Sequence, residues 1–318
     1  MKHWITLSIL TFLTFFLAET APSHGDTLIK VARGVYALVS HGDSVETGWG
    51  ANSGFIVGDS SVLVVDSRFT PQQASALITA VRRITHKPIS AVVNTSDRID
   101  RVLGNETFAN AGAEIIMQQR AAAFLSDIIG TIRMEIKNNP RYERLFSETV
   151  TLPNVNKVVR DSLWLDLGHR RILVFHPQEG AAATDGDLVV YVPDTKILFT
   201  GDLVVNGYHP NLANARSNPE HWLKVLSDLE KMPVDKIIPG RGSLTSKKQL
   251  RWMRSYIKHL CSEVQQAISK KQTVNQALAQ IPRPKGPLLM ESLWEQNIRS
   301  LYNFYLLKSK PNRDSENK

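Results

Sequence analysis

The chain has 318 residues, of which 42% are hydrophobic and 21% are charged, and its formal net charge is +8. This composition allows a substantial buried core in one large domain or two small ones, and it excludes a low-complexity chain. The positive charge does not by itself indicate a nucleic-acid partner, because Lys and Arg are scattered along the sequence and no nucleic-acid-binding motif is present.

The N-terminus has the pattern of an export signal. A basic residue, Lys2, precedes the apolar run 4–18, and small and polar residues follow it. This arrangement predicts a secretory signal peptide over residues 1–25, cleaved between Ala18 and Asp26. The mature protein is then expected to be periplasmic or secreted, with no membrane span. An uncleaved N-terminal anchor is the alternative, although the apolar run is short for a membrane-spanning helix.

The first half of the mature chain predicts a β-meander followed by a helix and a strand. Short apolar runs separated by Gly, Ser and Asp predict strands at 31–39, 54–57 and 61–66. Helical spacing of apolar residues, with proline at the start, predicts a helix at 71–84. A continuous β-rich run then predicts a strand at 89–94, so that strand, helix and strand alternate.

The second half predicts a similar order. The predicted elements are strands at 162–167, 171–175, 187–192 and 196–200, a helix at 219–230 and a strand at 236–239. An amphipathic helix at 119–137 separates the halves and can pack over the mouth of a site. Two mixed sheets face to face with helices outside, a four-layer αββα sandwich, accommodate this pattern. We therefore predict one α/β domain over residues 26–308.

Extra helices are predicted on the C-terminal side, at 250–268, 274–281 and 291–307. The last of these carries an apolar and aromatic stripe that is expected to be core. Cys261 is the only cysteine, so no internal disulfide can form, and its apolar helical phase predicts a core residue without a chemical role. The polar tail 309–318 is predicted to be disordered.

The candidate site lies at the ends of the predicted strands. In open α/β sheets the functional groups gather in loops just beyond the strand C-termini. Polar residues stand at five such ends, namely Asp66, Asn94, Thr184, Asp202 and Gly240.

Four of these loops resemble, in order, sequence blocks of the metallo-β-lactamase superfamily. The family run Asn-Thr-His-x-His-x-Asp-His is matched by residues 94–101, and the block His-Thr-x-Gly-Asp by residues 183–187. The family Gly-Asp motif is matched by residues 201–202, and the block Pro-Gly-His-Gly by residues 239–242. The resemblance covers roughly residues 28–260. Within the family, the later blocks are similar to periplasmic sulfur-oxidation or quinoprotein-associated members.

The resemblance implies two-zinc hydrolysis, yet the zinc-ligand positions are changed. All five ligand histidines are replaced, by Ser96, Arg98, Arg101, Ala183 and Arg241, whereas the two ligand aspartates remain as Asp100 and Asp202. A guanidinium stays protonated and has no lone pair for a metal, and two aspartates alone leave too few ligands. We therefore expect no zinc, and without zinc an attacking water keeps the high pKa of bulk water and is a poor nucleophile at neutral pH.

The arginines admit two interpretations. In the first, Arg98, Arg101 and Arg241 pair with Asp100 and Asp202 in an internal ion-pair cluster that replaces the metal. In the second, three arginines exceed two aspartates and leave positive charge for an anion such as a carboxylate, sulfate or phosphate. The leading hypothesis is an exported pseudoenzyme whose former metal cleft binds an anionic small molecule or a protein partner, without nucleic acid.

The alternative is a hydrolase with a relocated metal or a metal-free mechanism. Four histidines are candidate replacement ligands, namely His41, His176, His209 and His221, but none has ligand spacing. Of these, His209 is expected nearest to Asp202, so the weak metal candidates are Asp100, Asp202 and His209. A metal-free mechanism would use Ser96 as nucleophile with His41 or His209 as base.

A third hypothesis is electrostatic binding to a membrane surface or an acidic polymer. It rests on the net charge and on basic residues near one predicted helix, namely Lys247, Lys248, Arg251, Arg254 and Lys258. A solvated helix face explains the same run equally well.

Overall fold

The computed structural model describes residues 26–146, 150–177 and 180–309. The predicted signal peptide and residues 310–318 of the predicted tail lie outside the described residues. Among the helices of the described ranges, none combines the length and the apolar character needed to cross a bilayer.

The first sheet has seven strands in chain order. They are β1 (Thr27–Ala32), β2 (Val35–Val39), β3 (Ser53–Val57), β4 (Val62–Val65), β5 (Ile89–Val93), β6 (Glu114–Gln118) and β7 (Lys157–Val159). The first four strands are antiparallel neighbours, whereas β4 to β7 are parallel. The change occurs where helix α1 (Pro71–Ile84) carries the chain back, because parallel neighbours need a crossover. Thr70 caps this helix by accepting a hydrogen bond from the Gln73 backbone N–H.

The second sheet has five strands in the order β12-β11-β10-β9-β8. The strands are β8 (Ser162–Asp166), β9 (Arg171–Phe175), β10 (Val189–Val192), β11 (Ile197–Phe199) and β12 (Lys236–Ile238). Here too an antiparallel meander becomes parallel after a crossover helix, α6 (Pro219–Lys231), between β11 and β12. The predicted similarity in order between the two halves is therefore confirmed.

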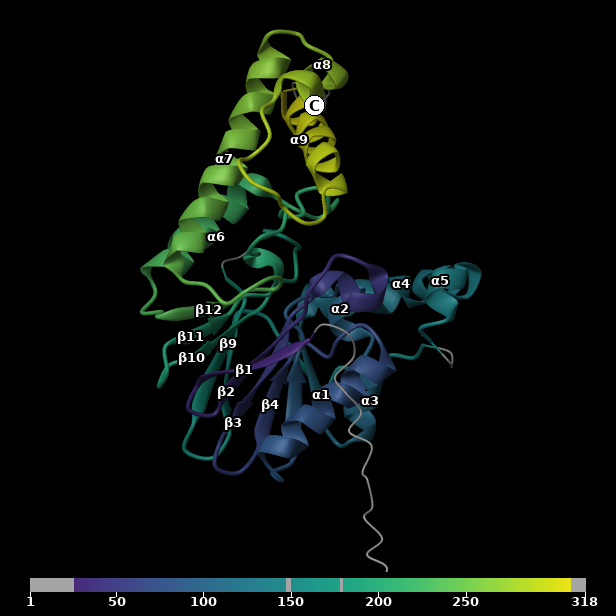
Figure 1. Cartoon of the computed structure of the whole chain (residues 1–318), viewed down its shortest axis with the longest axis vertical. Helices are drawn as coiled ribbons and strands as arrows, with labels where there is room; N and C mark the ends of the chain where they lie inside the picture. Colours follow the sequence, from purple (N-terminus) through teal and green to yellow (C-terminus); the bar gives the residue numbers. More distant parts are fainter. Residues whose placement is uncertain (1–25, 147–149, 178–179, 310–318) are drawn as a thin grey trace, which may run out of the picture.

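The sheets pack face to face because their strands are apolar on both sides. On β3, Phe55 packs toward the helices while the next residue, Ile56, enters the core between the sheets. On β4, Val64 likewise packs toward the helices, and Leu63 enters the core between the sheets. A third core lies between the second sheet and α6 with the C-terminal helices. The layers are thus helix, sheet, sheet and helix, the predicted αββα sandwich (Figure 1).

The remaining helices lie above and beside the sheets. Above the first sheet are η1 (Val45–Gly50), α2 (Ile99–Val102), α4 (Gln119–Asn138) and α5 (Pro140–Glu143), whereas α3 (Asn105–Asn110) lies beside the sheet next to α1 (Figure 1). The short helix η2 (Gly201–Leu203) follows β11. The C-terminal helices are α7 (Lys247–Ser269), α8 (Val274–Gln280) and α9 (Ser292–Ser309). They extend beyond the sheets at the top of Figure 1. The predicted aromatic stripe of α9 and Cys261 are buried in their shared core, as expected.

Several elements differ from the prediction. The single strand expected at 31–39 is two strands, because Gly34 adopts a φ of +67° and reverses the chain between β1 and β2. Strands β6 and β7 and helices α2, α3 and α5 were not predicted. Strand β6 has only five residues between two helices, a length at which an apolar run does not distinguish strand from helix.

Candidate functional site

The loop after β5 brings the motif residues to the top of the sheets. Asn94 holds this loop, because its side chain donates hydrogen bonds to the Arg101 carbonyl (2.8 Å) and to Asn105 Oδ1 (3.0 Å). The Thr95 carbonyl accepts from the Leu188 backbone N–H at 2.8 Å, which ties in the loop before β10. Helix α2 then begins after Arg98 and carries Asp100 and Arg101 inward.

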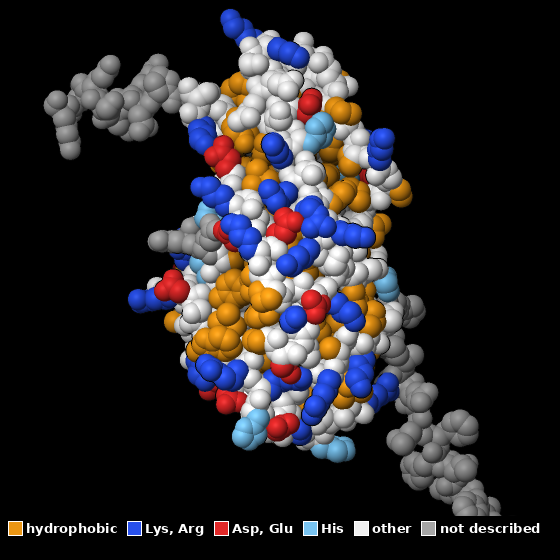
Figure 2. Space-filling view, turned by 90° about the vertical axis from the view of Figure 1, so that its left-hand side faces the viewer, with side chains coloured by type: hydrophobic (Ala, Val, Ile, Leu, Met, Phe, Trp, Pro, Cys, Tyr) orange, Lys and Arg blue, Asp and Glu red, His pale blue; other side chains and the backbone are white. Residues whose placement is uncertain are grey.

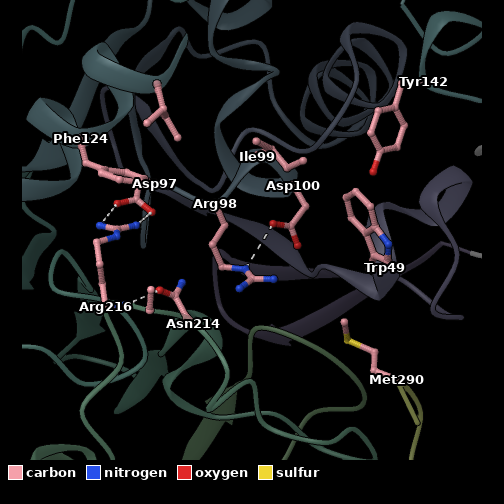
Figure 3. A pocket seen from close by; sticks show the side chains of 12 residues that line it. Trp49, Asp97, Arg98, Ile99, Asp100, Phe124, Tyr142, Asn214, Arg216 and Met290 are labelled. Carbon is pink, nitrogen blue, oxygen red and sulfur yellow. Dashed lines mark hydrogen bonds and ion pairs between the residues drawn. The ribbon is translucent and has the colours of Figure 1, made fainter. Parts of the chain in front are cut away.

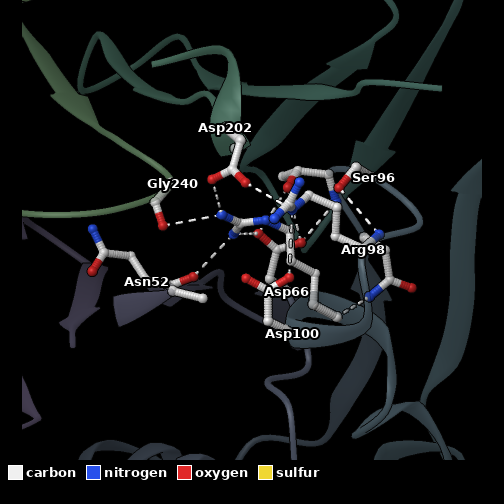
Figure 4. Close-up of polar contacts among 12 residues, drawn as sticks. Asn52, Asp66, Ser96, Arg98, Asp100, Asp202 and Gly240 are labelled. Atoms are coloured by element: carbon white, nitrogen blue, oxygen red, sulfur yellow. Dashed lines mark hydrogen bonds and ion pairs between the residues drawn. The ribbon is translucent and has the colours of Figure 1, made fainter. Parts of the chain in front are cut away.

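Arg101 is the centre of the candidate site, where Asn52, Asp66, Asp202 and Gly240 converge (Figure 4). Its side chain is fully buried. One terminal nitrogen donates to Asp66 Oδ2 at 2.7 Å, and the other contacts Asp202 Oδ1. The same two nitrogens also reach the Asn52 carbonyl (3.3 Å) and the Gly240 carbonyl (3.0 Å). This one guanidinium therefore joins four loops from both sheets.

Arg241 forms the second buried connection. Its Nη2 contacts Asp100 Oδ2 and lies 3.1 Å from Asp202 Oδ2. Its Nη1 donates to the Trp49 carbonyl at 2.5 Å. Trp49 has a φ of +52°, a conformation that costs free energy in a non-glycine residue and that this hydrogen bond helps to hold.

Arg98 differs from the other two arginines because it faces solvent. Its Nε lies 3.0 Å from Asp202 Oδ2 and 3.6 Å from Asp100 Oδ1, without hydrogen-bond geometry to either. Its side chain is 21% exposed. Within the described ranges, nothing accepts a hydrogen bond from its two terminal nitrogens, which leaves them available to a ligand.

The cluster holds as many carboxyl groups as guanidinium groups. Asp66 was predicted at a strand end but not as a partner of Arg101, and with it three carboxylates meet three guanidinium groups. Burial raises the pKa of Asp66, and Arg101 beside it opposes this only in part, so Asp66 is the least readily ionised of the three carboxyl groups. Burial alone would raise the pKa of Asp202, but Arg101 and Arg241 outweigh it and hold that pKa below its ordinary value. The pKa of Asp100 is lowered in the same way, against burial, mainly by Arg241 and Arg98. Both aspartates are therefore ionised.

The buried part of the cluster is tightly filled. The cavity among Asn52, Asp66, Arg101 and Gly240 has a volume of ≈ 10 Å³, at the lower limit for a single water. A second buried pair reaches the residue before Asn52, since Arg68 donates to Asp26 Oδ2 at 2.8 Å and to the Ala51 carbonyl at 2.9 Å. Arg101 and Arg241 consequently cross-link the loops and are closed to ligands.

The other replaced ligand positions do not form part of the ion-pair network. Ser96 is buried and its Oγ accepts a hydrogen bond from the Arg98 backbone N–H at 3.4 Å. Ala183 is buried in the core beside α6. In the described part of the chain, no histidine forms a hydrogen bond with Ser96, so the structure brings no base to this hydroxyl.

The four histidines considered as metal ligands take no part in the ion pairs of Asp100 and Asp202. His209 packs among the C-terminal helices, with Nδ1 2.6 Å from the Tyr256 hydroxyl, and burial lowers its pKa. His41 is exposed, with Nε2 3.4 Å from Thr27 Oγ1. His176 donates from Nδ1 to the Asp187 carbonyl at 2.7 Å, and His221 lies on α6.

These placements bear on metal binding. Across residues 26–146, 150–177 and 180–309, no three His, Cys, Asp or Glu side chains are grouped as a metal site. Guanidinium groups contact Asp100 and Asp202 in the place that a metal cation bound by these two carboxylates would occupy. The donor set of the cluster therefore does not fit zinc, which requires neutral imidazole, thiolate or carboxylate ligands in sufficient number.

A cleft of ≈ 470 Å³ opens beside the cluster (Figure 3). Its lining is mainly apolar and comes from segments far apart in sequence, namely Trp49, Asp97, Arg98, Ile99, Asp100, Phe124, Ile128, Tyr142, Asn214, Ala215, Arg216 and Met290. Helix α4 contributes Phe124 and Ile128, so the helix predicted at 119–137 lines this cleft. The volume lies in the range of small-molecule sites.

A second arginine of the cleft was not identified from the sequence. Arg216 binds both oxygens of Asp97 at 2.7 Å and also contacts Asp185. Its guanidinium carbon lies 3.5 Å from the centre of the Phe124 ring. Arg216 is thus already satisfied by two carboxylates and one aromatic face. No sequence motif surrounds it, and only the folded chain brings it to Asp97.

The basic residues of α7 have local partners. Arg251 and Arg254 each donate to Glu230 of α6 at 2.8 Å. Figure 2 shows Lys and Arg gathered on the side of the molecule that carries α6 and α7, with acidic side chains among them. Because these charges are partly compensated, this face resembles a solvated helix surface more than a single-sign patch.

Comparison with known proteins agrees with this architecture. The sequence model of the metallo-beta-lactamase superfamily matches residues 46–241, more than half of the chain. The metallo-beta-lactamase type 2 of Bacillus sp. (strain 170) is 24% identical over 200 residues, which cover 62% of this chain and 68% of that protein. Solved structures of similar fold include DIM-1 metallo-beta-lactamase (TM-score 0.58, 17% identity, covering 74% of this chain and 97% of that one). A metallo-beta-lactamase from Pontibacter korlensis has a TM-score of 0.58 at 18% identity and covers 73% of this chain and 99% of that one.

Proposed function

This chain belongs to the metallo-β-lactamase superfamily, and we propose that it is an exported, non-hydrolytic member that binds an anionic small molecule or a protein partner in the cleft. One observation carries the proposal. Arg98, Arg101 and Arg241 stand where the family motif has histidines, and all three contact the retained aspartates.

The chemistry of these residues argues against zinc-dependent hydrolysis. A guanidinium cannot donate a lone pair, and it adds positive charge where a dication would need negative charge. Asp100 and Asp202 are committed to ion pairs, so neither is free to activate a water. The same ion pairs can do the structural work of a metal, because they connect loops of both sheets through charge-assisted hydrogen bonds.

The cleft supports a binding role. It adjoins the cluster, has the volume of a small-molecule site, and is lined by the partly exposed Arg98 among mainly apolar side chains. Arginine forks suit carboxylate, sulfate and phosphate oxygens. Export rests on the sequence pattern of residues 1–25 alone, and mass spectrometry of the protein recovered from the periplasm or medium tests it by detecting cleavage between Ala18 and Asp26.

The decisive experiment is the metal content of the purified protein. After incubation with zinc and removal of free metal, elemental analysis is expected to find no bound zinc. The positive control is the same chain carrying Ser96→His, Arg98→His, Arg101→His, Ala183→His and Arg241→His, which restores neutral donors beside Asp100 and Asp202 and is expected to bind zinc.

Turnover is measured on the same samples with chromogenic β-lactam and ester substrates. The native chain is expected to hydrolyse none of them above background. Near-stoichiometric zinc, or turnover lost on Asp100→Ala or Ser96→Ala, would overturn the proposal in favour of a hydrolase with a relocated metal or a serine nucleophile.

A further inference from the structure

The cleft offers one unsatisfied cationic group, and this limits the ligands that fit it. Arg216 already holds Asp97 and Asp185, and Arg101 and Arg241 are sealed within the cluster. Among these arginines, only Arg98 both lines the cleft and has terminal nitrogens that donate no hydrogen bond to a described residue. Figure 3 shows its guanidinium in the middle of the cleft, between Asn214 and Met290.

The wall opposite this arginine is aromatic. Trp49 and Tyr142 meet edge to face with ring centres 6.4 Å apart, and Phe69 packs behind both at 5.0 Å and 6.2 Å. Glu46 and Arg141 form an exposed ion pair that joins the segments carrying these rings. The wall is therefore a supported surface of rings on which an apolar ligand body can lie.

Further apolar side chains complete the enclosure. Ile99 follows Arg98 on α2, Phe124 and Ile128 come from α4, and Met290 precedes α9. Figure 3 shows Met290 and Trp49 on the same side of the cleft, across from Phe124. A small, fully polar anion would leave this apolar surface exposed to water, whereas a ligand with an apolar body would bury it.

The carboxylates of the cleft restrict the charge of the ligand. Asp97 and Asp100 also line it, and both are almost completely buried in ion pairs. A second negative charge on a ligand would face these carboxylates without a free cation to balance it. A single anionic group can accept hydrogen bonds from the two terminal nitrogens of Arg98, whereas the second charge of a phosphate dianion would find no further free donor among these arginines.

We propose, on the basis of the proposed function, that the cleft binds amphipathic monoanions, in which one carboxylate or sulfonate engages Arg98 and a planar or aliphatic body packs against Trp49, Tyr142 and Ile128. The two terminal nitrogens of Arg98 form the fork that a carboxylate accepts. This assignment places the ligand's charge beside the cluster and its apolar body under α4 and α5.

The test is calorimetric titration of the purified protein with biphenyl-4-carboxylate and with its neutral analogue, biphenyl-4-carboxamide. The acid is expected to bind more tightly than the amide by about tenfold or more, because only the acid forms charge-assisted hydrogen bonds. Inorganic phosphate at the same ionic strength is expected not to displace the acid. Equal affinities, displacement by phosphate, or no binding of the acid would overturn the inference.

Two variants locate the site. Arg98→Gln is expected to remove the preference for the acid while leaving the affinity for the amide unchanged, and exposed Arg83→Gln on α1 is the control. Ile128→Asp places a negative charge in the apolar wall and is expected to weaken binding of the acid at least about tenfold. Its control, Met134→Asp, alters an exposed residue of the same helix, and unchanged binding is expected.

The zinc and turnover measurements separate the two proposals. Zinc binding or hydrolysis by the native chain would overturn the non-hydrolytic function, whereas the comparison of acid with amide still decides the ligand class. Conversely, a chain without zinc that binds acid and amide equally retains the proposed function and loses this inference. Preserved preference for the acid in Arg98→Gln would also contradict it.

Discussion

At the scale of single residues, Arg101 carries a fully buried charge. It is surrounded by Asp66, Asp202 and two backbone carbonyls in a space with room for at most one water. A buried ion pair does not by itself guarantee net stability, because both charges must be desolvated. Removing one partner is a different matter, since it leaves the other buried charges uncompensated.

Arg101→Met is therefore expected to lower the free energy of unfolding by about 3–5 kcal/mol. Methionine keeps the apolar stem but leaves Asp66 and Asp202 without their shared cation. Urea denaturation followed by circular dichroism measures the difference, with Arg83→Met as an exposed control that should change little. A loss as small as that of the control would show that the cluster does not hold the loops together.

Asp187 is expected to make the free energy of unfolding depend on pH. It is buried beside Thr184, and burial raises its pKa to about 7 from an ordinary value of 3.8. Between these two values the folded state binds more protons than the unfolded state. This residue's contribution to stability is therefore complete below about pH 4 and is lost as the pH rises toward 7.

The corresponding variant is Asp187→Asn, which is neutral like the protonated acid and whose amide oxygen can still accept the hydrogen bond from the Thr184 backbone N–H. The free energy of unfolding of the native chain, relative to this variant, is expected to fall by up to about 1.4 kcal/mol per pH unit between pH 4 and 7. Chemical denaturation at several pH values measures it. A difference that stays constant or rises with pH would contradict the assignment.

At the scale of elements, the loop after β12 meets η2 and α2 at very close range. A Cβ on Gly240 would lie 2.5 Å from the Gly201 carbonyl carbon and 2.6 Å from Arg101 Nη2. The glycine is needed because backbone and guanidinium groups occupy the space of a side chain. By contrast, a Cβ on Gly130 in α4 would meet nothing within 4 Å.

These two glycines form a matched pair. Gly240→Ala is expected to destabilise the fold by about 1–3 kcal/mol through overpacking. Gly130→Ala is expected to stabilise it by roughly 0.5–1 kcal/mol, because alanine favours the helix. Thermal unfolding of both variants provides the comparison, and a shift of the same sign in both would argue against the close packing around Gly240.

At the scale of the whole molecule, the αββα sandwich closes its upper edge with three aspartates and three arginines. Loops from both sheets converge there, and cross-links among them restrict how the sheets move apart. If ion pairs supply these cross-links, the melting temperature does not depend on a metal.

A chelator such as EDTA is accordingly expected to leave the Tm of the native chain unchanged within the error of measurement. The five-histidine variant, loaded with zinc, is the comparison, and its Tm is expected to fall on chelation. Differential scanning calorimetry measures both, and a fall in the native chain would reveal a structural metal.

The sequence by itself determined the fold class and the chemistry of the ligand positions. Turn residues, strand periodicity and four motif blocks are local features. They can be recognised in the sequence without knowledge of the tertiary contacts. They placed Asp100, Asp202 and the replaced histidines in order, and the structure brings the aspartates and arginines among them together. They also located helix α4 correctly, because its apolar spacing is long enough to be distinctive.

Only the tertiary structure decided which arginines are free. Asp66 pairs with Arg101, Arg101 and Arg241 are buried, and Arg98 faces a cleft whose wall comes from η1, α5 and the chain before α9. No local pattern encodes these relations, because they depend on contacts between residues as distant in sequence as Asp97 and Arg216. Whether a charge binds a ligand or stabilises the fold is set by its neighbours in space, and packing alone supplies them.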